Sequence, residues 1–389
     1  MRGLPQHKQI IMVEIREVKT RKEQKEFIEF PLKLYKDNPC FVPPLYGDEK
    51  KMFKKNFVYN DMCETICFNA YKDGKIVGRI SGIEQKTSNK IRNEKRIRFN
   101  KFDCIEDFEV AEKLFSAVEQ WSLSRGMDTV CGPLGYSDLE REGLLIEGFD
   151  QLSTFEEQYN AEYYKDFIEK LGYTKEIDWT ESKIRPKKDD DGSLQKMADF
   201  VMKRYNLHLG TAKNTNDFLK RYADQFFDLL DSSYKDIYGS VPFTDGMKKM
   251  MISNFKLIID LNHIVVVLNE KEEMVCLGLC FPSLAKALRG TNGKLTPINI
   301  IKLLRAIKHP DIVDLGLIGV DSRYINTGIN TVVCAGMMKI LEDPNIQYAE
   351  TNLNLEDNYS IQNMWKRFDR EMHKRRRSYV KVIGGKNND

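Results

Sequence analysis

Long apolar runs are absent from this sequence of 389 residues. No segment approaches the roughly 20 consecutive apolar residues that a membrane-spanning helix requires, so the sequence predicts no membrane partner. The opening MRGLPQHKQIIM is basic but lacks a long apolar core, and it is therefore not expected to be a secretory signal. We expect the fold to begin with a strand at Val13.

Metal-binding and redox patterns are also missing. The five histidines are isolated from one another. Among the eight cysteines, neither Cys63 and Cys67 nor Cys276 and Cys280 have the two-residue gap typical of zinc or redox pairs. The sequence therefore predicts no metal site. Reduced, buried thiols fit a reducing compartment, and we expect the protein to be cytoplasmic.

A charge excess of one sign is missing as well. The chain has 61 basic and 58 acidic residues, which gives a net charge of +3, so nucleic acid is not an expected partner. There is no Walker loop, no dinucleotide fingerprint after a strand and no Gly-x-Ser-x-Gly elbow. The sequence therefore lacks the signatures of these nucleotide-binding and hydrolase classes.

What the sequence does contain is a repeated order of elements. Residues 13–135 read as strand, helix, hairpin, strand, helix and strand, with the hairpin turning at Asp73-Gly74. Charge blocks around Pro186 and Gly192 mark a boundary, and a similar order follows it. The sequence predicts an α+β protein of two tandem domains, each a mixed, mostly antiparallel sheet flanked by helices: residues 12–185, a linker at 186–205, and residues 206–386.

A matching helix at the end of each half supports this duplication. Asn358 precedes a helix that carries Trp365, and Asn160 stands at the same spacing before Phe167. Asparagine is a favoured residue at helix N-termini. The repeated order together with the matched pair indicates an internal duplication, although two unrelated domains with ordinary capped helices would share these features.

Two stretches of the second half, VDSRYINTGIN and NLNLEDNYSIQNMWKRF, give the chain a family resemblance. With the order of elements, they resemble the GCN5-related N-acetyltransferase (GNAT) superfamily, best over residues 206–386 and more faintly over 12–185. The resemblance implies a tandem GNAT fold. It also implies that the strand DIVDLGLIGVD separates from its neighbour and offers backbone groups to the pantetheine arm of acetyl-CoA or another acyl-CoA.

The loop after that strand would hold the pyrophosphate of coenzyme A. The family pattern places Gln or Arg, a glycine, and a second small residue at positions that hold Ile325, Gly328 and Asn330 here, so only the glycine matches. The first half departs further, because its loop CIEDFE lacks glycine and is acidic, and we expect it to bind no coenzyme A. The resemblance implies these cofactor-binding residues: Ile318, Val320, Arg323, Thr327, Gly328, Ile329, Asn330 and Asn358.

The catalytic residues are harder to assign. The family commonly uses a tyrosine of the Asn-headed helix to protonate the departing thiolate, but that position holds Trp365 in the second half and Phe167 in the first. An acyl transfer to an amine also needs a base. The remaining candidates in the second half are Tyr359, Tyr379 and Glu356.

Two further segments carry unusual charge. The basic run HKRRRSYVK at 373–381 is expected to be a solvated hairpin edge, with contact to phosphates, to an acidic substrate or to nucleic acid as the functional alternative. The acidic, glycine-rich segment at 132–150 has a length that is often functional. It is predicted either to fold over a cleft or to pack between the halves.

Together these features predict an N-acyltransferase that moves an acyl group, most simply acetyl, from acyl-CoA to an amine of a small molecule. One alternative is a non-catalytic protein that binds a ligand on the duplicated fold. Another is a transferase that uses a different acyl donor, such as an aminoacyl-tRNA. The sequence does not determine the acceptor, the acyl length or the oligomeric state.

Overall fold

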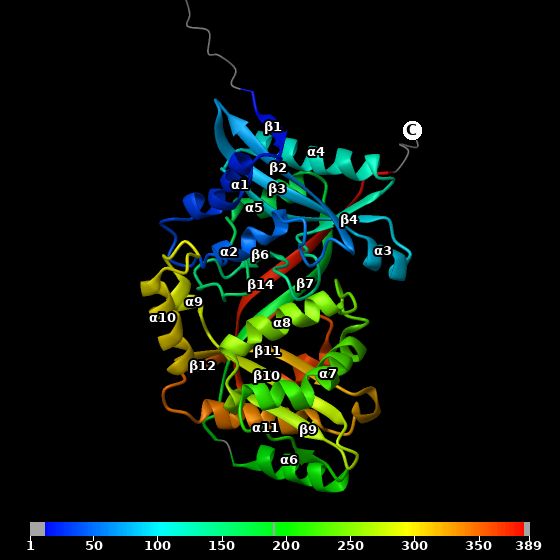
Figure 1. The fold of residues 1–389 in the computed structure, drawn as a ribbon, viewed down its shortest axis with the longest axis vertical. Coiled ribbons are helices and arrows are strands. Elements are labelled where there is room, and N and C mark those ends of the chain that lie inside the picture. Colours follow the sequence, from blue (N-terminus) through cyan, green and yellow to red (C-terminus); the bar gives the residue numbers. More distant parts are fainter. Residues whose placement is uncertain (1–11, 190, 385–389) are drawn as a thin grey trace, which may run out of the picture.

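The computed structural model describes residues 12–189 and 191–384, so the opening residues before Met12 lie outside the described residues. Within these ranges, fourteen strands form one twisted sheet that runs through both halves of the chain (Figure 1). Its order along the main path is β1-β2-β3-β4-β5-β14-β7-β12-β11-β10-β9-β8, with β6 paired to β14 and β13 paired to β7. The α+β prediction is confirmed.

The first half follows the predicted order. The hairpin turns at Asp73 and Gly74, which both have positive φ. Asp107 caps its long helix by accepting a hydrogen bond from Glu109 N–H. The elements are β1 (Glu14–Glu17), α1 (Arg21–Leu34), α2 (Tyr46–Glu49), β2 (Cys63–Lys72), β3 (Lys75–Gln85), α3 (Lys86–Arg92), β4 (Arg96–Cys104), α4 (Phe108–Ser124), β5 (Thr129–Gly132), β6 (Leu144–Glu147), α5 (Tyr163–Lys170) and β7 (Thr174–Arg185).

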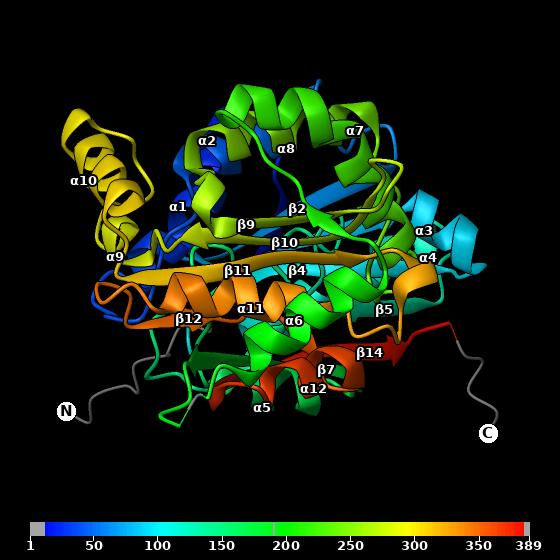
Figure 2. The ribbon, with the colours of Figure 1, turned by 90° about the horizontal axis from the view of Figure 1, so that it is seen from below.

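The second half repeats this plan with helices on both faces of its strands: α7 and α8 lie on one face, α6 and α11 on the other (Figure 2). Its elements are α6 (Ser193–Arg204), β8 (His208–Leu209), α7 (Thr215–Tyr234), α8 (Asp245–Ile258), β9 (Ile264–Leu268), β10 (Met274–Pro282), α9 (Ala285–Leu288), α10 (Pro297–Lys308), β11 (Ile312–Val320), α11 (Asn330–Leu341), β12 (Tyr348–Glu350), β13 (Asn354–Leu355), α12 (Tyr359–Trp365) and β14 (Asp369–Val382).

The two halves exchange their last strands. β14 belongs to the second half by sequence, yet its residues 379–382 pair with β5 of the first half. β7 belongs to the first half, yet it pairs with β12 and β13 of the second. The two strands also pair with each other along most of their length, which places them side by side at the centre of the molecule (Figure 1). Each half's sheet is therefore completed by the other half's strand.

The expectation of a solvated hairpin edge for the basic run at 373–381 is wrong. The run lies in β14, between β5 and β7, and its Lys374 and Arg376 side chains are buried. Lys374 Nζ lies 2.6 Å from both Glu181 Oε2 and Glu350 Oε1, and Arg376 Nε lies 2.6 Å from Glu181 Oε1. The sequence predicted that Lys374 and Arg376 would be in solvent. Both are instead stabilised in the interior because buried carboxylates pair with them.

Asn160 also differs from its expected role. Its side chain does not cap α5, which begins at Tyr163 after Glu162. Instead it accepts a hydrogen bond from Leu145 N–H at 2.7 Å and donates to Leu145 O at 3.1 Å. Asn358 does cap its helix, because its Oδ1 accepts from Ile361 N–H at 3.2 Å. The predicted match between the two asparagines is therefore only positional.

Residues 186–205, which the sequence predicts as a linker, include α6. This helix packs on α11 and places Leu194, Ala198 and Val201 in the core of the second half. The proposed domain boundaries themselves stay a prediction. All eight cysteines are unpaired and only Cys40 is not fully buried. Among the described helices, none is both long enough and apolar enough to cross a membrane.

Candidate functional site

A gap opens in the second half's sheet between β11 and β12. These parallel strands pair only over residues 312–314 and 348–350. Beyond Asp314, β11 continues along β10 as far as Val320, without β12 at its other edge. The backbone groups of Ile318 and Val320 face this free edge, as the resemblance implied for a pantetheine-binding strand.

The end of α7 occupies that free edge. Tyr234 Oη donates to Ile318 O at 3.2 Å and accepts from Ile318 N–H at 3.3 Å. Ser233 Oγ makes the same pair of contacts with Val320, at 3.0 and 3.2 Å. Burial raises the pKa of Tyr234 to about 12, so the hydroxyl remains protonated at neutral pH. An amide-bearing ligand that paired with this edge would have to displace both hydroxyl groups.

The loop after β11 leads directly into the N-terminus of α11. Gly328 has a φ of 85°, a conformation that favours glycine. No side chain caps α11 in the described structure, so its positive end remains available to an anion. Asn330 Oδ1 is buried and has no hydrogen-bond partner among the described residues. The glycine and the uncapped helix end are compatible with a phosphate group at the loop.

Arg323 is paired with acidic side chains and is therefore not available to bind a phosphate. Its guanidinium binds Asp321, with Nη2 2.7 Å from Oδ2, and lies 3.2 Å from Glu273 Oε2. Thr327 donates its hydroxyl hydrogen to Tyr324 O at 2.7 Å. A large cavity lies beside this loop, and neither Arg323 nor Thr327 lines it. The other six predicted cofactor-binding residues do line it: Ile318, Val320, Gly328, Ile329, Asn330 and Asn358.

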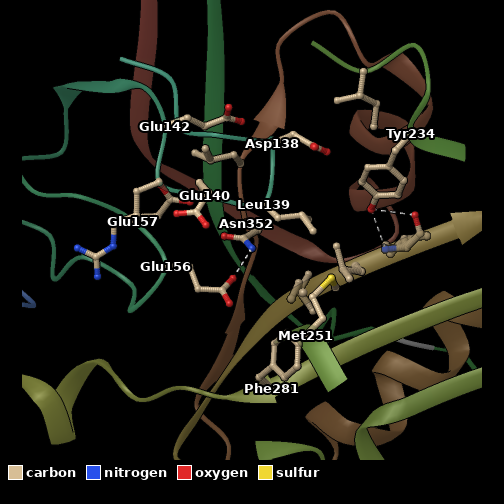
Figure 3. A pocket seen from close by; sticks show the side chains of 18 of the residues that line it. Asp138, Leu139, Glu140, Glu142, Glu156, Glu157, Tyr234, Met251, Phe281 and Asn352 are labelled. Atoms are coloured by element: carbon tan, nitrogen blue, oxygen red, sulfur yellow. Dashed lines mark hydrogen bonds between the residues drawn. The ribbon is translucent and has the colours of Figure 1, made fainter. Parts of the chain in front are cut away.

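One large cavity, of about 1720 Å³, connects this gap with the first half. Its walls include the free edge of β11, the start of α12, the end of α7 and the segment 135–142 of the first half. The loop that carries Asn352 also contributes, and Asn352 Nδ2 donates to Glu156 Oε2 at 3.0 Å (Figure 3). The cavity is therefore built by both halves.

Acidic side chains from the first half gather at one side of this cavity. Figure 3 shows them opposite Met251 and Phe281, on the segment between β5 and β6 and on the segment after β6. Arg141 belongs to the segment between β5 and β6, but its Nη2 donates to Phe155 O at 2.5 Å. The acidic residues are Asp138, Glu140, Glu142, Glu156 and Glu157.

Glu142 is the most isolated of these carboxyl groups. Its side chain is only 4% exposed, and Oε2 has no hydrogen-bond partner among the described residues. Burial, followed by the charges of Asp138 and Glu157, raises its pKa well above the ordinary value. Once ionised, a carboxyl group in this environment is a stronger base than one in water, which suits proton transfer.

Asp138 and Glu157 have raised pKa values for the same main reason. Burial raises the pKa of Asp138 to about 6. Burial also raises the pKa of Glu157 to about 8, although Arg376 Nε lies 3.4 Å from its Oε2 and opposes the shift. Carboxyl groups with such values are typical of functional sites, but they also occur in structural ion-pair networks.

The opposite side of the cavity is apolar. Helix α8, strand β10 and helix α10 provide long aliphatic and aromatic side chains there. The cavity thus combines a carboxylate-lined region with a hydrophobic one, and it suits a ligand that has a polar head and a long apolar chain. The apolar residues include Met247, Met250, Met251, Phe255, Ile258, Phe281, Leu284, Leu303 and Ile307.

The structure separates the three predicted catalytic residues. Tyr359, the first residue of α12, lines the cavity. Tyr379 is fully buried in the core of the first half, and its hydroxyl donates to Glu169 Oε1 at 3.0 Å. Glu356 lies outside the cavity lining, where its carboxylate is 2.6 Å from Lys175 Nζ. Only Tyr359 is placed near the candidate site, and the catalytic role of all three stays a prediction.

Sequence reasoning missed the buried carboxylates and Tyr234. The acidic composition of residues 132–150 was the available signal for Asp138, Glu140 and Glu142, and the structure places that segment between the halves and along the cavity. Nothing in the pattern of α7 distinguished Tyr234 from the other aromatic residues of that helix. Its position depends on how α7 packs across β11, a contact between residues distant in sequence.

The corresponding gap in the first half is filled. β4 and β5 pair only over residues 96–98 and 129–131. Beyond this point, Tyr164 Oη accepts from Cys104 N–H at 2.7 Å, and Tyr163 Oη donates to Cys104 O at 2.7 Å. Tyr164 is fully buried. Aromatic side chains thus occupy the space that the second half leaves open.

The architecture defines a class of fold. The two halves of the sheet each contain a pair of parallel strands that separate, which is a tandem GNAT fold, and solved structures share it. A tandem GNAT protein from the clavulanic acid biosynthesis pathway matches with a TM-score of 0.54 at 9% identity, over 97% of this chain and 100% of that one. A GCN5-related N-acetyltransferase from Sphaerobacter thermophilus matches with a TM-score of 0.51 at 10% identity, over 95% and 96% of the two chains. The predicted resemblance is confirmed for the fold.

Two curated proteins are similar in sequence. Protein YghO of Escherichia coli strain K12 is 28% identical over 383 residues, which cover 95% of each chain. Bacterial ceramide synthase of Caulobacter vibrioides is 27% identical over 333 residues, which cover 84% of this chain and 85% of the relative. No family model matches the chain. In the described residues, no group of three His, Cys, Asp or Glu side chains could hold a metal ion.

Proposed function

We propose that the protein is an N-acyltransferase that moves a long-chain acyl group from acyl-CoA to the amine of a long-chain lipid base. The observation that carries this proposal is the single cavity that joins the free edge of β11 to buried carboxylates and to a large apolar region. The fold supports acyl transfer as the class of reaction. The chemistry of the cavity supports the two substrates.

The second half would hold the donor. The carbonyl group of Ile318 and the edge groups of Val320 would pair with the pantetheine amides, and the Gly328 loop with the start of α11 would face the pyrophosphate. An acetyl group would fill little of a cavity of about 1720 Å³. The apolar walls therefore favour a long acyl chain over the acetyl group that the sequence most simply predicted.

The first half would hold the acceptor. A protonated amine is attracted by the carboxylates of the acidic segment, and Glu142 would take its proton. The free amine then attacks the thioester carbon, whose oxygen would be polarised by Ile318 N–H. A carbon–nitrogen bond forms and the carbon–sulfur bond breaks. The thiolate leaves with a proton that we assign to Tyr359, and the proton that the nitrogen loses on forming the amide restores the Tyr359 hydroxyl.

The name of one relative agrees with this substrate class. Ceramide is the amide of a fatty acid and a long-chain amino alcohol, and the Caulobacter relative is named a ceramide synthase. A long-chain amino alcohol has the polar, cationic head and the apolar tail that the two sides of the cavity suit. We propose that the reaction takes place in the cytoplasm, with a small amine-bearing lipid as the partner.

A thiol-release assay tests the proposal. Purified protein is incubated with acetyl-, octanoyl- or palmitoyl-CoA and either a long-chain amino alcohol or a short amine, while free coenzyme A and the amide product are measured. We expect product with the long acyl donor and the long amine. Gly328→Trp should abolish it by filling the loop, whereas Gly74→Trp, at another glycine of positive φ with open space around it, should not.

The Tyr359 assignment has its own test. Tyr359→Phe should lower kcat by about hundredfold while leaving the affinity for acyl-CoA unchanged, as expected for loss of a proton donor. A variant with unchanged kcat would remove Tyr359 from the mechanism.

A second candidate function follows from the contacts of Ser233 and Tyr234. These hydroxyl groups already satisfy the edge that a pantetheine arm would use, so the cavity could bind an amphiphile without coenzyme A. Binding of the long-chain amine with no thiol release from any acyl-CoA would favour this non-catalytic function.

A further inference from the structure

Helix α10 has an unusual distribution of apolar residues. Leu303 and Ile307 face the body, where they pack against the cluster around Leu284 and Leu288. Yet no residue of this helix is fully buried, and Ile298, Ile301 and Leu304 are 69%, 66% and 59% exposed. Their spacing of three residues places them in one exposed stripe. A surface helix of a protein that stays in water normally presents polar residues there.

Basic residues surround this stripe. Residues 283–310 contain no Asp or Glu, although the whole chain is nearly balanced in charge. Among the described residues, only Lys286 of this segment has a carboxylate within ion-pair distance, that of Asp311. The local excess of positive charge is therefore not neutralised by the protein. The basic residues are Lys286, Arg289, Lys294, Lys302, Arg305 and Lys308.

The stripe lies beside the cavity. Leu295 and Leu304 line the cavity, together with Leu257 at the end of α8, which is 75% exposed. Figure 2 shows α10 standing out from one end of the molecule, next to α9. We name the α10 surface as the set Leu257, Leu295, Ile298, Ile301, Leu304, Lys294, Lys302, Arg305 and Lys308.

We propose that the α10 surface docks on a lipid bilayer that contains anionic headgroups. The apolar stripe would enter the boundary between headgroups and acyl chains, while the lysines and arginines would contact the negative headgroups. The sequence predicted no membrane partner because it has no spanning segment. Docking at the interface needs only one apolar, basic face, and that is what α10 provides.

The charge of the α10 surface argues for a bilayer over a second copy of the chain. A twofold symmetric dimer brings the same patch of each copy together. Such a dimer would place these basic residues against one another with no acidic residue in the segment to separate them. An anionic bilayer offers both an apolar layer and compensating charge.

This inference does not depend on acyl transfer. If the proposed function also holds, the position of the α10 surface would let a lipid amine pass from the bilayer into the cavity without crossing water. Vesicle binding is measured without either substrate, so its outcome is independent of the activity assay.

Vesicle co-sedimentation of the full chain tests the proposal. We expect binding to vesicles of phosphatidylglycerol and phosphatidylcholine, weaker binding as salt rises, and little binding to phosphatidylcholine alone. Ile298→Asn with Ile301→Asn should reduce the bound fraction about tenfold. Neither residue lines the cavity, and both are exposed, so the variant should keep the thermal stability of the parent.

Matched variants complete the design. Ile91→Asn changes an isoleucine of α3 that is 62% exposed and should bind vesicles as the parent does. A variant with Lys302→Gln, Arg305→Gln and Lys308→Gln should lose the preference for anionic vesicles. A control variant with Lys113→Gln, Lys220→Gln and Lys339→Gln, which changes three exposed lysines of other helices, should keep it. No vesicle binding by the parent would overturn the proposal. So would unchanged binding by the α10 variants, or a dimer that the Ile298 and Ile301 substitutions dissociate.

Discussion

Glu142 links the folded state to pH. Its pKa is raised above the ordinary value of 4.5 by burial and by the charges of Asp138 and Glu157, so the folded protein holds this proton more tightly than the unfolded chain. The resulting stabilisation is fully present below the unfolded pKa and is lost as pH rises through the folded pKa. We expect Tm to fall across that range, and Glu142→Gln to reduce the fall because an amide does not ionise.

Thermal unfolding of the parent and of Glu142→Gln from about pH 5 to about pH 9 measures this effect. Glu112→Gln, an exposed change on α4, serves as the control and should follow the parent. Equal slopes for the parent and Glu142→Gln would show that this carboxyl group is not the source of the pH dependence.

Ser233 and Tyr234 permit a second prediction at the residue scale. Because their hydroxyl groups occupy the edge of β11, Ser233→Ala with Tyr234→Phe should strengthen acyl-CoA binding by about fivefold, which corresponds to one net hydrogen bond. Titration calorimetry with palmitoyl-CoA measures the change. Ser232→Ala is a suitable control, since that hydroxyl bonds Leu229 O within α7. Weaker binding would mean that the hydroxyl groups contact the ligand.

For individual residues, the sequence predicted backbone positions better than it predicted side-chain positions. Ile318 and Val320 were placed at a strand edge, and the structure locates them there with their backbone groups turned toward the gap. Their role with a cofactor stays a prediction. The side chains of Glu142 and Tyr234 depend on contacts between halves, and no local pattern encodes those.

At the scale of elements, the buried charges of β14 are important for the stability of the fold. Lys374 stands directly opposite Glu181 on β7, and it also contacts Glu350 of β12. Lys374→Gln would leave the buried Glu350 without its closest cation and the buried Glu181 with only Arg376. We expect it to lower the free energy of unfolding by about 3 to 5 kcal/mol.

Chemical denaturation of Lys374→Gln measures this loss. Lys381→Gln, on the same strand, is the control: Lys381 is partly exposed and pairs with Glu119 at 2.8 Å, so its loss should cost about 1 kcal/mol or less. A Lys374 variant as stable as the Lys381 variant would contradict the importance of the buried pair.

Elements with local signals were predicted well. The Asp73-Gly74 turn, the Asp107 cap and the Asn358 cap each depend on residues close in sequence, and each is present. The basic run at 373–381 was misjudged, because its alternation was visible but the strands on either side of it were not. Pairing with β7 joins residues about 200 positions apart, and pairing with β5 joins residues about 250 positions apart.

For the whole molecule, the exchange of β7 and β14 leads to a prediction about the two halves. A fragment of residues 12–185 keeps β5 and β7 but loses β14, which lies between them. One edge of β5 and both edges of β7 would then lack partners, because β7 also loses β12 and β13, so we expect this fragment to aggregate when produced alone. Co-production with residues 186–389 should restore a soluble complex.

Size-exclusion chromatography and circular dichroism of each half, alone and together, distinguish these outcomes. A soluble, folded monomer of residues 12–185 would contradict the prediction and support separable domains at the boundary drawn from sequence. The duplication and the tandem GNAT fold were both foreseen from element order. The exchange was not, since the order of elements along the chain is the same with or without it.

The shared central strands also bear on how the protein is made. β14 follows every other strand in the chain, so it leaves the ribosome after the rest of both halves has been synthesised. Until then the first half holds an open slot between β5 and β7, and it cannot close by local pairing. The nascent protein would therefore stay incomplete until one late segment joins the two halves of the sheet in a single step.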